Sequence, residues 1–573
     1  MAAKLIRTEI LVVGSGLAGC IAAIQAHDLG VEVLVLEKGL FAKSGSSVMA
    51  SRFSLYTFDP KPLSDWGGGP YVQPGLIDDE DLRRNLKVET ASNAQASWRF
   101  LAEFENMGAL FRRSSDGKIW PQTAGGCHSS KLDMTGKMVM QVLGAQVKKR
   151  GVKILESTVA TRLLTRNGEV VGVTALDIER GELLAIAAKS VILATGSTAW
   201  YPTSTLPDNL SGDGSAMAFR AGAELADLCE IIFYNYKNPA VPPRRWVFPI
   251  EDWDIKPLDW RTPKTLNARG ADIWQMPEYQ RWFNVAAAHG LDGKKQGIPL
   301  WLKVYVNACE IAAGRGTDRG GVYVSYRHMA DLAGKMKESW WRYSFFEKIG
   351  VNPMRDLMEV GVVPHLERGG VVTDAKTEAT GLPGLFVIGS AISGVGGLMG
   401  CVSTAKWSAK YGVERCQQVK KTPAPDESDV VAEESRISRL LETVGKGECF
   451  FSSSVKRMVK QVLQDTCFFW KEEKMMQQGL ERLAAIRRDV LPNLRLESGS
   501  RRFNQGLVDA LDAENLLDLS ELYIEMALRK KESRGVFRRL DYPEESSVFT
   551  GVRVRLEDGE KRFRTVTVKI PWD

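Results

Sequence analysis

The sequence contains no run of about 18 uncharged apolar residues, the length that a helix needs to cross a bilayer. Its eight cysteines are scattered and form no Cys-x-x-Cys pair. Such spacing is typical of reduced thiols and excludes a disulfide framework or an iron–sulfur cluster held by this chain. No signal peptide is recognisable, because the first apolar stretch runs directly into a glycine motif. These absences predict a cytoplasmic protein whose membrane association, if any, is peripheral and made through partner subunits.

A strong charge excess is also missing. The chain has 76 Lys and Arg against 70 Asp and Glu, a formal net charge of +6 that is not clustered. Nucleic-acid binding calls for concentrated basic residues and is not expected. The 44% hydrophobic and 25% charged residues are ordinary globular values, which exclude a disordered or fibrous chain. At roughly 100–200 residues per domain, 573 residues predict several domains.

The beginning of the chain predicts a strand, a tight turn, a helix and a second strand over residues 9–36. The turn carries Gly14, Gly16 and Gly19: one glycine for the turn, one for close approach of a pyrophosphate and one for helix–strand packing. Leu17 and Ala18 open the helix, whose N-terminal N–H groups would face the phosphates. The acidic residue after the second strand, Glu37, can accept hydrogen bonds from ribose hydroxyls. A glycine turn of any α/β protein is the alternative, but the complete context favours nucleotide binding.

Further strand-like runs follow at 152–156, 170–176, 183–187, 190–194 and 384–388. The stretch 236–354 is rich in Trp and Pro and indicates an inserted domain. After a linker at 422–428, helical spacing is found at 454–470, 472–490 and 512–531, and the chain closes with a hairpin turning at Asp558-Gly559. We expect domains over 1–235 and 355–418 (two parts of one), 236–354, 430–540 and 541–573.

Several motifs, taken in order, carry a family resemblance. They are GSGLAG at 14–19, His128 with DMTG at 133–136, SGDGSAMAFRAGAELAD at 211–227, EIAAGRG at 310–316, His365 with Gly369-Gly370, GLPGLFVIG at 381–389 and KESRG with DYP at 531–543. In order and spacing the chain resembles the flavoprotein subunits of the succinate dehydrogenase and fumarate reductase superfamily, which includes L-aspartate oxidase and the adenylylsulfate reductase alpha subunit.

The resemblance implies an α/β fold: a Rossmann-like FAD-binding domain interrupted by an α+β capping domain, then a C-terminal helical domain and a terminal β-hairpin. It implies FAD as cofactor, a small-molecule substrate between FAD and cap, and a ferredoxin-like iron–sulfur electron-transfer partner. No metal site is expected. The implied cofactor contacts, besides the turn and Glu37, are Lys38, Lys43, Ser44, Gly45, Ser46, Ala194, Thr195, Gly196, Asp213, Gly389, Ser390 and Ser403.

Departures from the family pattern concern the cofactor first. Gly45 stands where members with covalent FAD carry a histidine, so the resemblance implies non-covalent FAD. Ser390 stands where succinate-converting members have an acidic residue.

The substrate residues depart further. The proton-transfer arginine is replaced in the stretch Pro299-Leu300-Trp301, and the carboxylate-clamping arginine in the stretch 397–399 around Leu398. The family's His-Pro-Thr segment is replaced by residues 234–237, whereas its histidine is retained as His365. We therefore expect poor turnover of succinate, fumarate or aspartate.

Four residues are candidate catalytic groups. His365 can donate to an oxyanion or transfer a proton, although a lone histidine is often structural. Arg315 either binds substrate or joins cap to base by a salt bridge. Lys303 and Tyr305 are candidates for the missing proton-transfer group, against the alternative that Lys303 is merely exposed.

Three functions remain open from the sequence. The first is an FAD-dependent oxidoreductase that exchanges hydride with a carbonyl- or carboxylate-activated substrate. The second is sulfur-oxyanion chemistry like that of adenylylsulfate reductase, and the third is a non-catalytic FAD electron-transfer subunit. Arginines at 553, 555, 562 and 564 could make the hairpin an exposed basic surface for an acidic partner, or simply a solvated edge.

Overall fold

The computed structural model describes residues 4–50, 100–111, 113, 117, 135–237, 263–280, 284, 300–334, 337, 341–348, 350–374, 376–394, 397–442, 450–544, 546 and 548–569. His128, Asp133, Pro299 and five tryptophans of the inserted stretch (Trp246, Trp253, Trp260, Trp282 and Trp340) lie outside these residues. Within them, no helix is both long and apolar enough to cross a membrane.

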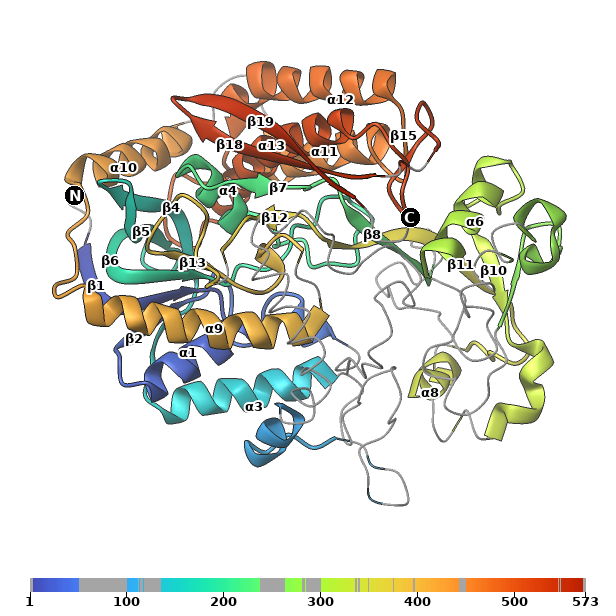
Figure 1. Cartoon of the computed structure of the whole chain (residues 1–573), viewed down its shortest axis with the longest axis horizontal. Helices are drawn as coiled ribbons and strands as arrows, with labels where there is room; N and C mark the ends of the chain where they lie inside the picture. The colour runs from blue at the N-terminus through green and yellow to red at the C-terminus, as the bar shows by residue number, and fades with distance from the viewer. Residues whose placement is uncertain are drawn as a thin grey trace.

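A seven-stranded sheet forms the centre of the part of the molecule that contains the glycine turn, here called the nucleotide-binding half (Figure 1). Its strand order is β3-β2-β1-β6-β5-β4, with β13 also paired to β6. The strands around β1 pair in parallel, whereas β4, β5 and β6 pair antiparallel. The bounds are β1 Lys4–Val13, β2 Val33–Leu36, β3 Lys153–Leu155, β4 Thr158–Arg166, β5 Glu169–Asp177, β6 Glu182–Leu193 and β13 Leu385–Val387.

The end of β1 is apolar on both faces because both faces of this sheet are covered. Ile10 and Val12 pack into a core with α1 (Leu17–Asp28), α3 (Thr135–Lys149) and α9 (Gly397–Gln418). Leu11 and Val13 belong to the opposite core, which contains α4 (Asp213–Arg220). Because side chains alternate along β1, this strand contributes to both cores, one on each face of the sheet.

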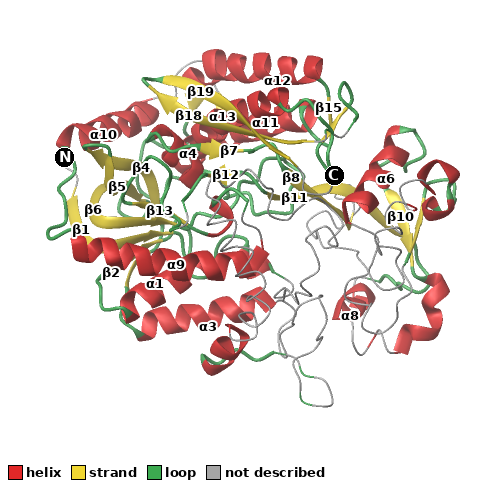
Figure 2. Cartoon of the chain, in the orientation of Figure 1, coloured by secondary structure: helices red, strands yellow, loops and turns green. Residues whose placement is uncertain are grey.

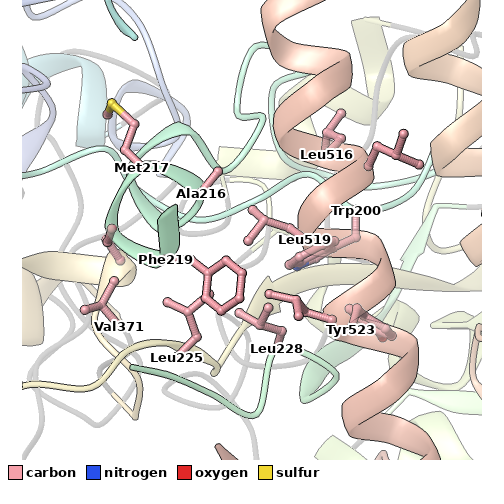
Figure 3. Close-up of a cluster of buried hydrophobic side chains, with 14 of the residues drawn as sticks. Trp200, Ala216, Met217, Phe219, Leu225, Leu228, Val371, Leu516, Leu519 and Tyr523 are labelled. Carbon is pink, nitrogen blue, oxygen red and sulfur yellow. The ribbon is translucent and has the colours of Figure 1, made fainter. Parts of the chain in front are cut away.

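The helices α10 to α13, here called the helical region, complete that second core. Figure 3 shows one part of it, where Leu516, Leu519 and Tyr523 of α13 lie near Trp200. Their bounds are α10 Glu427–Glu442, α11 Ser452–Thr466, α12 Glu473–Ala485 and α13 Gln505–Arg529. Helix α13 is buried along most of its length, and its residues Leu516, Leu519 and Tyr523 have no exposed surface. The short pairs β14 (Phe450–Phe451) with β16 (Leu494–Arg495) and β15 (Trp470–Lys471) with β17 (Arg538–Arg539) lie between or beside these helices.

A second antiparallel sheet, order β8-β11-β10-β9, lies to one side with α6 and α8; we call it the cap region (Figure 2). Its elements are β8 Ile231–Lys237, β9 Lys264–Leu266, α6 Leu300–Ala312, β10 Val322–Ser325, α8 Trp341–Lys348 and β11 Met358–Glu367. It has a core of its own, which includes Leu302, Val306 and Val360. The long strand β11 continues from the cap region toward the nucleotide-binding half.

The C-terminal hairpin belongs to a third sheet, order β12-β7-β18-β19. The bounds are β7 Leu225–Ala226, β12 Gly370–Val371, β18 Val548–Glu557 and β19 Glu560–Lys569. Both turn residues, Asp558 and Gly559, have positive φ, as a tight two-residue hairpin turn requires. The expectation of an exposed basic row is wrong at Arg553, which is fully buried and lies 3.3 Å from the Glu224 carboxylate. Arg564, opposite it on β19, also pairs with Glu224 at 2.6 Å, because β7 brings that acid beneath the hairpin.

The fold class expected from the sequence is confirmed, with differences in detail. The runs 183–187 and 190–194 are one strand, β6, and the strand β4 was not anticipated. Helix α13 begins at Gln505, seven residues before the expected start, because Asn504 caps it by accepting a hydrogen bond from the Leu507 N–H.

Candidate functional site

The glycine turn between β1 and α1 has the geometry of a dinucleotide cradle. Gly14 has a φ of +103°, and a Cβ there would lie 2.5 Å from the Ala194 carbonyl oxygen. A Cβ on Gly19 would lie 2.0 Å from the Gly14 carbonyl oxygen. Gly16 caps α1 without a side chain, and a Cβ there would meet only the Ser47 hydroxyl, at 3.2 Å. Two glycines thus permit packing, and the third keeps the positive end of the helix approachable for a pyrophosphate.

Glu37 is buried at the end of β2 and holds the neighbouring loops. One carboxylate oxygen accepts from the Ser15 N–H at 3.0 Å and the Ser15 hydroxyl at 2.6 Å, and the other accepts from the Gly39 N–H at 2.8 Å. A carboxylate has about four acceptor sites, so capacity for a ribose hydroxyl remains. Residues 43–46 follow in the same loop: Lys43 is exposed, and Ser44, Gly45 and Ser46 are half-buried.

The other expected cofactor segments converge on this edge. Ala194 packs against Gly14 and Gly19, and a Cβ on Gly214 would lie 2.1 Å from the Thr195 hydroxyl. Gly389 has a φ of +66° and approaches Ala18, and its N–H donates to the Thr404 hydroxyl at 3.0 Å. Gly196, with positive φ, continues the loop after β6, Ser390 follows Gly389, and Ser403 is half-buried on α9. Loops after β1, β2, β6 and β13 therefore meet, which fits an extended dinucleotide.

Lys38 and Asp213 form an ion pair that also contacts the helical region. The Lys38 ammonium donates to Asp213 at 3.0 Å, Ser211 at 3.1 Å and Asp512 of α13 at 2.5 Å. Asp213 also accepts from Asn515 of α13 at 3.1 Å. Burial opposes the charge of Lys38, but the two carboxylates outweigh it and raise its pKa; Lys38 likewise lowers the pKa of Asp213 against the effect of burial. Both side chains therefore connect loops of the nucleotide-binding half to α13 of the helical region.

His365 lies near the end of β11, half-buried. Its Nδ1 is 2.5 Å from the hydroxyl of Thr205, a residue of the loop after β6, and the Tyr234 ring contacts it edge-on at 4.6 Å. The Thr205 N–H also donates to the Pro364 carbonyl at 3.1 Å. Burial lowers the pKa of His365 to about 4. The imidazole is therefore neutral at physiological pH and acts as a hydrogen-bonding group rather than a cation.

Glu367 was not identified from the sequence. It is 4% exposed, and its two carboxylate oxygens accept from the Thr198 N–H and the Trp200 indole N–H, each at 2.6 Å. Burial raises its pKa to about 8. A buried acid between His365 and the Gly369-Gly370 turn was the available signal. Glu367 and Thr205 together fasten the loop 197–205 to β11.

Arg315 and Tyr305 are engaged in packing of the cap region. Arg315 donates to the buried Glu310 carboxylate at 2.5 Å and 2.9 Å, and Tyr279 donates to the same carboxylate at 2.5 Å. Tyr305 lies 4.5 Å from the Arg538 guanidinium and packs against Trp470. Lys303 is half-buried on the same helix, α6.

The stretch in which the carboxylate-clamping arginine is replaced lies at the start of α9. Leu398 is half-buried at the start of that helix. The nearby Lys406, a possible replacement, is ion-paired with Glu103 at 2.6 Å and lies over the Phe100 ring at 4.3 Å.

Comparisons with known protein families identify two domains. Residues 9–61 and 79–235 match an FAD binding domain, and residues 456–569 match the fumarate reductase flavoprotein C-terminal domain. FAD is thus the cofactor of this chain.

Relatives of this chain extend over almost its full length. It is 27% identical over 561 residues to one subunit of the fumarate reductase (CoM/CoB) of Methanothermobacter marburgensis, covering 95% of this chain and 96% of that protein. It is 24% identical to the succinate dehydrogenase flavoprotein subunit of Rickettsia bellii, covering 94% of this chain and 90% of that protein.

Solved structures share the fold. A quinol fumarate reductase chain of E. coli superposes with a TM-score of 0.81 at 19% identity, covering 99% of this chain and 98% of that one. Adenylylsulfate reductase from Archaeoglobus fulgidus superposes with a TM-score of 0.75 at 20% identity, covering 100% and 98%.

Proposed function

The chain is an FAD-dependent oxidoreductase of the fumarate reductase and succinate dehydrogenase flavoprotein family, and from that premise we propose that it is the catalytic flavoprotein subunit of a redox complex. The proposed reaction is hydride exchange between FAD and a substrate carbon activated by a neighbouring carbonyl or carboxylate. The proposed electron partner is an iron–sulfur subunit, since this sequence has no cysteine spacing suited to a cluster of its own.

FAD, when bound, supplies hydride transfer at its N5 position and one-electron exchange with a partner. The loops around Gly14, Gly16 and Glu37 would hold its pyrophosphate and ribose. Attachment is proposed to be non-covalent, because Gly45 has no side chain that could form a bond.

The observation that carries the proposal is the pairing of His365 with Thr205 beside the Gly369-Gly370 turn. A Thr205 hydroxyl that donates to Nδ1 leaves the proton of the neutral imidazole on Nε2. His365 would then offer Nε2–H as a hydrogen-bond donor to a substrate oxygen. That donor stabilises negative charge that develops on the oxygen during hydride transfer.

The substrate class is proposed to exclude small dicarboxylates. These need charge-assisted, preferably bidentate contacts, and Leu398 cannot make one. One retained donor, His365, suits a thioester, ketone, monocarboxylate or sulfur oxyanion.

Anaerobic titration of the purified flavoprotein with a panel of substrates tests the proposal. The panel includes saturated thioesters, ketones and monocarboxylates, and also sulfite with adenosine monophosphate. We expect a carbon substrate to bleach the flavin of the wild type. The same substrate should not bleach the flavin of His365→Ala, although this variant retains FAD. Bleaching by sulfite alone would favour sulfur-oxyanion chemistry instead, and a flavin reduced only by an electron-transfer protein would show a non-catalytic subunit.

A further inference from the structure

The segment 211–214, which ends the loop before α4 and begins that helix, is packed directly against α13 of the helical region. Gly212 has a φ of +73°, and a Cβ there would lie 2.4 Å from a Leu519 methyl carbon and 2.9 Å from the Thr198 hydroxyl. Figure 3 shows Leu519 and Leu516 of α13 beside Trp200 of the loop after β6. No side chain fits between these surfaces, so the position of the loop depends on the position of the helix.

A single carboxylate of α13 joins two of the nucleotide loops. Asp512 is 1% exposed, and one of its oxygens accepts from the Lys38 ammonium at 2.5 Å and from the Ser211 hydroxyl at 2.7 Å. Lys38 follows Glu37 in the loop after β2, and Ser211 precedes α4. Asp512 therefore bridges loops that are 173 residues apart in the sequence.

The charges at this junction are balanced only when α13 is in place. Lys38 lies between Asp213 of the nucleotide half and Asp512 of the helical region, and Asp512 also faces Lys456 of α11 at 3.6 Å. Buried ion pairs of this kind are costly to break because the remaining charge is left uncompensated. Loss of the Asp512 charge would leave both Lys38 and Ser211 with one carboxylate partner, Asp213, in a buried setting.

We propose that α13 positions the loops of the FAD site. Its residue Asp512 is a positioning residue for the cofactor and acts through Lys38 and Ser211. The inference rests on the FAD binding described above and goes beyond it. Docking of the helical region and binding of FAD are then thermodynamically linked, so that each favours the other by the same factor. FAD should be retained more weakly wherever this junction is loosened, although no atom of α13 need touch it.

Asp512→Asn tests the proposal, and Asp509→Asn is the matched control. Asp509 lies one turn earlier on the same helix and pairs with Lys456 at 3.3 Å. FAD is removed from each variant, and the dissociation constant is measured by quenching of flavin fluorescence on rebinding. Because Asp512→Asn loses a charge-assisted hydrogen bond, its dissociation constant for FAD should rise about 10-fold or more. That of Asp509→Asn should rise less than about 2-fold.

Thermal unfolding separates positioning from a merely structural role. If Asp512 only stabilises the fold, the Tm of Asp512→Asn falls equally in the apo and FAD-bound forms. The increase in Tm on adding FAD then equals that of the wild type, and this result overturns the proposal. Equal weakening of FAD binding in both variants also overturns it. The expected result is a smaller FAD-induced increase in Tm in Asp512→Asn alone.

Hydrogen exchange on the wild-type chain provides a second measurement should Asp512→Asn fail to fold. Adding FAD to the apoprotein should slow amide exchange in α13 but leave α12 unchanged, and equal exchange of α13 with and without FAD would contradict the linkage. Failure of the wild type to bind FAD at all would instead contradict the proposed function, which keeps the two tests distinct.

Discussion

The Nδ1 atom of His365 lies 2.5 Å from the hydroxyl oxygen of Thr205, and this contact joins a strand of the cap-region sheet to a loop of the nucleotide-binding half. His365 is on β11, which pairs with β8 of the cap region, whereas Thr205 follows β6 of the nucleotide-binding sheet. The hydrogen bond thus fixes the orientation of the imidazole relative to the loop after β6.

Thr205→Val should lower kcat/KM by roughly 10- to 100-fold with FAD content unchanged, because the ring loses the group that sets its tautomer and orientation. Steady-state kinetics with the substrate identified by flavin bleaching measures this. Thr203→Val is the control, since the Thr203 hydroxyl lies in the same loop but donates to Gln464 at 2.9 Å. Equal losses in the two variants would show that the loop, not the His365 contact, is responsible.

Glu367→Gln should change how stability depends on pH. Burial raises the pKa of Glu367 to about 8, well above that of an unfolded glutamate, so the folded chain binds more protons between these values. The stabilisation that Glu367 contributes to the folded state is full below the pKa of an unfolded glutamate. It is lost as the pH rises through about 8. Relative to Glu367→Gln, the wild type should lose about 1.5–4 kcal/mol of unfolding free energy between roughly pH 6 and pH 9. Urea unfolding at the two pH values measures the difference, and parallel curves would refute it.

Arg315→Met should act mainly on stability. It leaves the Glu310 carboxylate, which has no exposed surface, without its ion-pair partner, at a cost of about 2–4 kcal/mol. Denaturant unfolding measures the loss, and Arg319→Met is a control because Arg319 is more than half exposed. A large rise in KM with unchanged stability would instead assign Arg315 to substrate binding.

Fumarate should reoxidise the reduced flavin slowly. Each charged contact missing from a buried carboxylate forfeits about 1.5–3 kcal/mol, and a carboxylate near Leu398 would be left unpaired. Anaerobic stopped-flow absorbance measures the rate. Rapid reoxidation that is lost in His365→Ala would demonstrate a working dicarboxylate site and contradict this expectation.

FAD should be released by acid. Residue 45 is glycine with a φ of +76°, and it offers no nucleophile for a covalent bond. After precipitation with trichloroacetic acid, the yellow colour should remain in the supernatant. Flavin fluorescence retained in the washed pellet would disprove non-covalent binding.

Local patterns predicted the features that depend on neighbours in the sequence. The β1–α1–β2 unit, its three glycines and the turn at Asp558-Gly559 follow from residue type and spacing, and the structure has them at the expected places. The helix and strand limits moved by several residues where a cap or a long-range pairing decided them.

Residues whose partners are distant could not be assigned in the same way. Period-two alternation groups Arg553 with Arg555, yet only Arg553 is buried, because β7 brings Glu224 beneath it. The partners of Glu367 and Asp512 could not be predicted either, since they lie in the loop after β6 and the loop after β2. Composition cannot reveal which of many acids meets a buried cation or N–H group.

The pairing of β18 with β7 has a consequence for biosynthesis. The Asp227 N–H donates to the Val552 carbonyl at 2.9 Å, and the Val552 N–H donates to the Asp227 carboxylate at 3.0 Å. Chains are made from the N-terminus, so Asp227 and Glu224 leave the ribosome long before the strand that covers them. The nucleotide-binding half therefore cannot complete its folding during translation, and a nascent chain stalled before β18 should remain protease-sensitive and unable to retain flavin.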